Sequence, residues 1–307
     1  MKGELAYQAL YRSGELKSRV EAALAILKSC QLCPRRCKVN RLSEEQGKCR
    51  TGRQAIVSSY GPHFGEEAPL VGSHGSGTIF FTYCNLRCVF CQNYTISQMG
   101  EGTAVTRQEL AQMMLALQAR GCHNINLVTP THVVPQILEA LLLACAQGLA
   151  LPLVYNCGGY ESLETLKLLD GIVDIYMPDM KYSNAEIARE YSGVEDYPSI
   201  NRAAVKAMHR QVGDLQMDEH GVATRGLLVR HLVLPYGLAG TDAVVRFLAE
   251  EISQSTYLNI MAQYRPCHLA FRFPLLARPV TREEFLQAVN VARQRGLKRL
   301  DRPYAIY

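Results

Sequence analysis

From residue 78 onward, short apolar runs alternate with longer stretches whose apolar residues repeat every three or four positions. The short runs predict buried strands and the longer stretches predict helices. The expected strands are Thr78–Thr82, Ile125–Thr129, Leu151–Tyr155, Ile172–Met177, Leu227–Leu234 and Leu258–Gln263. The expected helices are Thr106–Arg120, Val134–Gln147, Ser162–Leu169, Ile200–Val212, Asp242–Ser253 and Thr281–Arg295. Strands followed by helices predict an α/β fold with parallel strands and right-handed crossovers, and six units rather than eight predict a partial TIM-like (β/α)6 barrel.

The segment before this pattern differs in character. Residues 4–29 have helical spacing, and residues 30–49 are rich in cysteine. We therefore expect an N-terminal helical, Cys-rich extension over residues 1–70 and the partial barrel over residues 71–307. The polar stretch Asp218–Gly221 predicts a hairpin turn before the fifth strand.

Composition narrows the class of protein. The chain has 307 residues, of which 48% are hydrophobic, so it can form a sizeable core. No apolar run reaches the roughly 18–20 residues needed to cross a membrane, and the first residues lack the plan of a signal peptide. The net charge of +5 is too small to indicate a nucleic-acid partner. Eleven cysteines without a secretion signal favour reduced thiols and metal binding, so we expect a cytoplasmic protein without membrane or nucleic-acid partners.

Three cysteines directly after the first predicted strand carry the strongest chemical signal. Cys84, Cys88 and Cys91 have the spacing C-x3-C-x2-C. Cysteine thiolates are the ligands of [4Fe–4S] clusters, and three of them would leave one iron open to a small chelating molecule. The alternative for this spacing is a zinc knuckle.

A second group, Cys30, Cys33, Cys37 and Cys49, offers four thiolates within twenty residues. Four thiolates close a tetrahedral shell, which suits a structural zinc ion or a second iron–sulfur cluster. The spacing does not decide between these two, although Cys-x2-Cys with Pro34 favours a zinc knuckle.

Further polar residues follow the predicted strands, where barrels of this kind carry their chemistry. Asn156 follows the third strand, and Asp179 and Lys181 follow the fourth. By alternation His231 could face the inside of the barrel or be a structural histidine. The roles of His132, Cys157 and Cys267, which also lie near strand ends, are left open, and no residue is assigned as catalytic.

These motifs resemble the radical S-adenosylmethionine (radical SAM) superfamily, specifically pyruvate formate-lyase activating enzyme-like proteins of the PflX type. The resemblance rests on the three-cysteine loop with Phe90, on Met177-Pro-Asp179-Met-Lys181, and on Cys-x2-Cys-Pro-Arg-x-Cys with Gly65-Glu-Glu-Ala-Pro69. It implies a [4Fe–4S] cluster whose open iron binds SAM, with Phe90 near the adenine. It also implies that Asp179 helps to bind a monovalent cation beside the SAM carboxylate, with Lys181 and Asn156 close by.

The resemblance further implies the reaction. Flavodoxin or ferredoxin would reduce the cluster, SAM would be cleaved to a 5′-deoxyadenosyl radical, and the radical would abstract hydrogen from a glycine of a partner glycyl-radical enzyme. The chain departs from the family in lacking a Gly-Gly-Glu stretch after the second strand, and its extra cysteines precede the main motif. The alternatives are radical modification of another protein residue or of a small metabolite, and a non-catalytic metal-binding adaptor.

Overall fold

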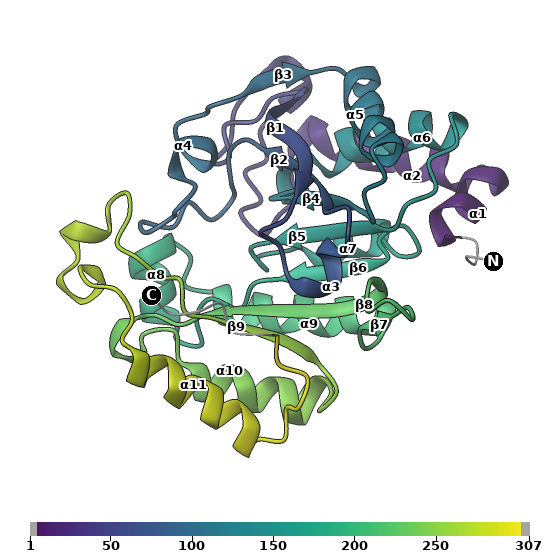
Figure 1. Ribbon diagram of the computed structural model, residues 1–307. Helices are drawn as coiled ribbons and strands as arrows, with labels where there is room; N and C mark the ends of the chain where they lie inside the picture. The colour runs from purple at the N-terminus through teal and green to yellow at the C-terminus, as the bar shows by residue number, and fades with distance from the viewer. Residues whose placement is uncertain (1–4, 302–307) are drawn as a thin grey trace.

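The computed structural model describes residues 5–301, and six parallel strands form its centre (Figure 1). In spatial order they are β2 (Ser76–Phe81), β4 (Ile125–Val128), β5 (Leu153–Cys157), β6 (Ile175–Pro178), β8 (Ala223–Leu232) and β9 (Tyr257–Met261). All six predicted strands are present, and the α/β fold with a parallel sheet is confirmed. Within the described residues β2 and β9 do not pair with each other, so the barrel is partial and open.

Three strands were not predicted from the sequence. β1 (Ala55–His63) pairs antiparallel with β2 and with β3 (Thr103–Val105), and β7 (Gln216–Met217) forms a hairpin with β8. The hairpin turn expected at Asp218–Gly221 is therefore confirmed. β1 escaped notice because its second half is only partly buried and reads as polar. Since β1 and β2 share one sheet, the sheet extends across the expected domain boundary at residues 70 and 71.

Helices cover the outer face of the sheet. The two N-terminal helices replace one predicted helix, because Gly14 adopts a left-handed φ of +82° between them. Capping boxes fix the starts of α5 and α11, where the side chains of Thr106 and Thr281 each accept a bond from the backbone N–H of a glutamate three residues on. The helices are α1 (Ala6–Ser13), α2 (Glu15–Ile26), α3 (Ala68–Val71), α4 (Tyr94–Ser97), α5 (Arg107–Ala119), α6 (Val134–Ala146), α7 (Leu163–Leu168), α8 (Ala185–Ser192), α9 (Tyr197–Val212), α10 (Thr241–Phe247) and α11 (Arg282–Gln294). No helix among residues 5–301 is long and apolar enough to cross a membrane.

The inside of the barrel is layered, because neighbouring residues in register point to the same face of a sheet. Its lower part, towards the amino ends of the parallel strands, is apolar and contains Val154, Ile175, Met177 and Leu228. Leu70 of α3 packs among these side chains with no exposed surface, so the segment before β2 fills the lower end of the barrel. Above this apolar plug the interior becomes polar, with one layer formed by Asp179, Arg230 and Asn259.

Candidate functional site

The three-cysteine loop follows β2 directly and is held in an unusual conformation. Tyr83 and Arg87, on either side of Cys84, have φ values of +71° and +59°. Residues other than glycine seldom adopt this region, and such strain is typical of functional sites. The side chain of Asn85 anchors the loop by donating to the Tyr160 carbonyl at 2.8 Å. The loop therefore has one defined shape that presents its cysteines together.

All three cysteines line one cavity of about 380 Å³ at the carboxyl ends of the parallel strands. This volume falls in the range of about 300–1,000 Å³ that is typical of small-molecule sites. The strand ends supply the other walls, which include Thr129, Asn156, Asp179, Lys181, Arg230 and Asn259. The structure thus brings together the three cysteines and the polar residues predicted after the third and fourth strands.

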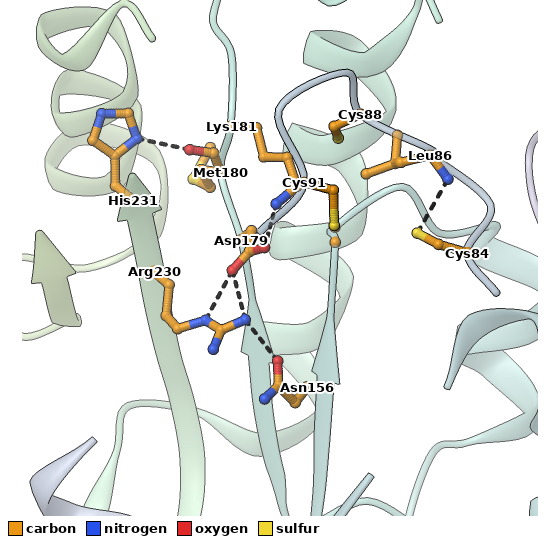
Figure 2. A network of polar contacts seen from close by, with 12 residues as sticks. Cys84, Leu86, Cys88, Cys91, Asn156, Asp179, Met180, Lys181, Arg230 and His231 are labelled. Atoms are coloured by element: carbon orange, nitrogen blue, oxygen red, sulfur yellow. Dashed lines mark hydrogen bonds and ion pairs between the residues drawn. The ribbon is translucent and has the colours of Figure 1, made fainter. Parts of the chain in front are cut away.

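Arg230 connects the polar residues of this cavity (Figure 2). Its guanidinium donates to Asp179 at 2.8 Å and to the Asn156 side-chain oxygen at 2.7 Å. Lys181 contacts the other oxygen of Asp179. Burial alone would raise the pKa of Asp179, but Arg230 and Lys181 outweigh it and hold that pKa below its usual value. Asp179 is therefore ionised and is paired with both cations.

Glu67 completes the lower wall of the cavity. It is buried and accepts a hydrogen bond from Asn259 at 2.9 Å, and its other carboxylate oxygen has no hydrogen-bond partner in the described residues. Burial raises its pKa against the attraction of Arg230, 3.9 Å away. The cavity floor therefore carries a second acidic group.

Each cysteine sulfur of the loop has a polar neighbour. The backbone N–H of Leu86 lies 3.4 Å from the Cys84 sulfur, and the Ser192 hydroxyl donates to the Cys88 sulfur at 2.9 Å. The hydroxyl of Ser97 lies 3.1 Å from the Cys91 sulfur. Hydrogen bonds to cluster sulfurs are one of the means by which proteins set reduction potentials. Each of the three sulfurs therefore has one polar group within reach.

Comparison with known proteins agrees with this geometry. Residues 78–212 match the model of the radical SAM superfamily. The chain is also 33% identical over 292 residues to the uncharacterized protein MJ0674 of Methanocaldococcus jannaschii. The aligned segment covers 92% of this chain and 79% of that protein. The chain belongs to the radical SAM superfamily. Membership implies an enzyme that uses a [4Fe–4S] cluster and SAM, rather than a metal-binding adaptor.

The loop of this radical SAM protein fits a cluster better than a single ion. Among residues 5–301, neither this loop nor the second cysteine group has its side chains already arranged around one metal ion, so metal binding would have to draw the four sulfurs of the second group together. In a cluster each thiolate binds a different iron, so the sulfurs stand farther apart than around one ion. Burial raises the pKa of Cys84 to about 12, and binding of a metal by a thiol releases its proton.

Other predicted residues of the radical SAM site lie outside the cavity wall. Phe90 is buried and packs edge-to-face against Tyr182 and Tyr264. His231 faces the outer layer, where Nδ1 donates to the Met180 carbonyl at 2.7 Å and Nε2 accepts from Thr241 at 2.9 Å. It is therefore a structural histidine, and its neighbour Arg230 faces the interior instead.

His132 is also buried on the outer side. Its Nε2 donates to the carbonyl of Thr82 at 2.8 Å, and burial lowers its pKa to about 4. Cys157 is buried in the main core and also borders the cavity that the three cysteines line, and Cys267 is half-buried in the segment after β9. None of these contacts indicates a direct part in catalysis.

The second cysteine group also converges. Cys30, Cys33, Cys37 and Cys49 line a separate cavity of about 10 Å³ beside the cluster loop. Sequence reasoning missed Arg230, Glu67 and Ser192, which reach the site from a fifth strand, from the segment before β2 and from α8. The only sequence signal for Arg230 was its place in a strand next to His231, where alternation puts one of the two inside.

Proposed function

We propose that Cys84, Cys88 and Cys91 hold a [4Fe–4S] cluster that binds SAM, and that the enzyme activates a partner protein by taking hydrogen from a glycine. The observation that supports this is the shared cavity, in which three thiols face Asp179, Lys181 and Arg230 at the strand ends. When bound, the cluster supplies the electron that cleaves SAM to methionine and a 5′-deoxyadenosyl radical, which abstracts hydrogen from a substrate C–H bond.

The polar residues would bind and orient the methionine end of SAM. Lys181 and Arg230 are the two cations beside Asp179 and Glu67 in the cavity wall, and either can attract a ligand carboxylate. The side-chain oxygen of Asn156 already accepts a hydrogen bond from Arg230. The Asn156 NH2 group can therefore donate a hydrogen bond to a ligand. The expected monovalent cation would compete with Lys181 and Arg230 for Asp179, because both already contact it.

The partial barrel supports a substrate that enters from the side. The cavity reaches from Phe80 on β2 to Met261 on β9, and the described sheet does not close between β9 and β1, the strand that pairs with the outer side of β2. A peptide loop carrying glycine could enter there, and flavodoxin or ferredoxin would supply the electron. The motif from Met177 to Lys181 favours this activase-like role over modification of another protein residue or of a small metabolite.

The test uses anaerobically reconstituted full-length protein with dithionite as reductant. We expect 5′-deoxyadenosine from SAM, and we expect none from Cys84→Ala, Cys88→Ala or Cys91→Ala variants. Cys145→Ala, which changes a cysteine on α6, is the matched control and should keep full cleavage. Wild-type protein that binds four irons yet cleaves no SAM would overturn the proposal.

The glycine step is tested with a candidate partner protein in which glycine is deuterated at Cα. Deuterium in the released 5′-deoxyadenosine would support hydrogen abstraction from glycine. The opposite result is unlabelled 5′-deoxyadenosine with deuterated glycine but labelled 5′-deoxyadenosine with a deuterated metabolite or another deuterated residue. That result would favour radical modification of the metabolite or of that residue.

A further inference from the structure

The second cysteine group lies against the cluster loop rather than apart from it. Arg35, between Cys33 and Cys37, donates to the carbonyls of Asn85 and Leu86 at 2.9 and 3.2 Å. The same guanidinium donates to the carbonyls of Ser192 and Gly193 at 3.0 and 2.9 Å. Asn85 and Leu86 lie between Cys84 and Cys88, and Ser192 is the residue whose hydroxyl contacts the Cys88 sulfur.

The four cysteines converge through local backbone structure. Backbone bonds between Cys30 and Val39 and between Lys38 and Cys30 bring the two ends of the first cysteine segment together. The backbone N–H of Lys48 donates to the Cys37 sulfur at 3.4 Å. A Cβ atom on Gly47 would lie only 2.8 Å from that sulfur, so glycine is needed for this close approach.

A buried positive charge beside the four thiols lacks an acidic partner. Arg41 has 1% of its surface exposed. Within residues 5–301 its hydrogen-bond partners are the carbonyls of Gly52 and His132, with the Cys30 sulfur at 3.9 Å, and none is a carboxylate. A buried charge is strongly destabilising unless an opposite charge compensates it.

The residues around the small cavity extend this argument. Its lining contains four basic side chains, from Arg35, Arg36, Arg41 and Lys48, and no acidic side chain. Arg36 pairs with Glu164 at 3.6 Å, but neutral thiols would leave the buried charge of Arg41 unbalanced. Four thiolates around Zn²⁺ or around a [4Fe–4S]²⁺ cluster carry a net charge of about −2, which supplies the missing counter-charge.

We propose that Cys30, Cys33, Cys37 and Cys49 bind a second metal centre through four thiolates, and that this centre fixes the cluster loop in place through Arg35. The centre is distinct from the SAM-binding cluster, and its existence does not depend on the proposed substrate. Metal binding releases the thiol protons and closes the cysteine segment, which carries Arg35 to the carbonyls of the cluster loop.

The first test isolates the second centre in a Cys84→Ala/Cys88→Ala/Cys91→Ala variant of the full chain. Anaerobically purified protein should contain about one zinc ion or about four irons per chain. Zinc with no visible cluster absorbance identifies the zinc form, and iron with sulfide identifies the cluster form. Folded variant protein without either metal would overturn the proposal.

The second test removes ligands from the otherwise unaltered protein. Cys33→Ala and Cys49→Ala should lose the second metal, whereas Cys145→Ala should keep it. If these variants fold poorly, Arg41→Met provides a milder change and should weaken metal binding at least about tenfold, because it removes the buried counter-charge. Arg295→Met is the matched control, since Arg295 does not line this cavity and pairs with Asp242 at 2.8 Å, so its loss should leave metal binding unchanged. Equal metal affinity in the two arginine variants would contradict the proposed counter-charge.

The coupling between the sites has its own readout. Arg35→Met should leave the second metal bound but lower the iron retained at Cys84, Cys88 and Cys91 by at least about twofold during anaerobic gel filtration. An Arg35→Met protein with both metal sites fully loaded would refute the role of the second centre in holding the loop.

Discussion

The Arg230 guanidinium lies 2.8 Å from the Asp179 carboxylate and joins strands β8 and β6 across the top of the open barrel. The same guanidinium reaches Asn156 on β5, so one side chain ties three strand ends together. Asp179 in turn holds Lys181 at the cavity wall. The charge that a bound SAM molecule would meet is therefore set by this group of residues as a whole.

Asp179→Ala should weaken SAM binding while leaving the iron content unchanged, because it releases Lys181 and Arg230 without touching the cysteines. The loss of charge-assisted hydrogen bonds of roughly 1.5–3 kcal/mol corresponds to about tenfold or more in affinity. Equilibrium binding of SAM to the reconstituted protein measures it. Asp174→Asn, a change at the opposite end of β6 that keeps an acceptor for the Leu153 N–H, should leave SAM affinity unaltered. Equal affinities in the two variants would remove Asp179 from the SAM site.

Ser192→Ala should lower the reduction potential of the cluster. The serine hydroxyl donates to the Cys88 sulfur and stabilises the more negative, reduced state, so its removal favours oxidation. A hydrogen bond worth about 0.5–1.5 kcal/mol corresponds to a decrease of roughly 20–65 mV for one electron. Redox titration followed by EPR gives the potential. Ser199→Ala, whose hydroxyl bonds only the nearby Asp196 carbonyl among the described contacts, is the control and should show no change.

His231→Gln should destabilise the protein more at pH 7 than at pH 4.5. Burial lowers the folded-state pKa of His231 to about 4, below the unfolded value of about 6.5. The neutral histidine therefore contributes stability above pH 6.5, and this contribution is lost as the pH falls towards 4. The difference between the two pH values should be about 2 kcal/mol in the free energy of unfolding. Urea unfolding of both proteins measures it, and a pH-independent effect of the substitution would show that His231 titrates normally.

Leu70→Ala should lower the free energy of unfolding by about 2–5 kcal/mol, because it leaves a cavity where α3 fills the lower barrel. Leu163→Ala on α7 is the matched control, since that side chain is 50% exposed and its loss should cost within about 0.5 kcal/mol. Urea unfolding midpoints compare the two. If both variants lost only about 0.5 kcal/mol of unfolding free energy, the packing of Leu70 would contribute little to the stability of the protein.

The local sequence determined the parallel strands and the spacing of the cysteines. Each parallel strand is buried on both faces and therefore reads as a continuous apolar run, which is visible without the rest of the chain. The cysteine loop is equally local, because its three cysteines lie within eight residues. The half-exposed β1 lacks such a run and so could not be recognised.

Only the tertiary structure decided which polar groups meet. Arg230 and His231 are neighbours in one strand, and the register with β6 places Arg230 inside and His231 outside. The hydroxyl of Ser192 reaches Cys88 across 104 residues, and Arg35 reaches Ser192 across 157. Such contacts depend on how helices and loops pack on the sheet, and no spacing along the chain encodes them. The buried charge of Arg41 likewise became evident only when its partners were found to be carbonyls and a sulfur rather than a carboxylate.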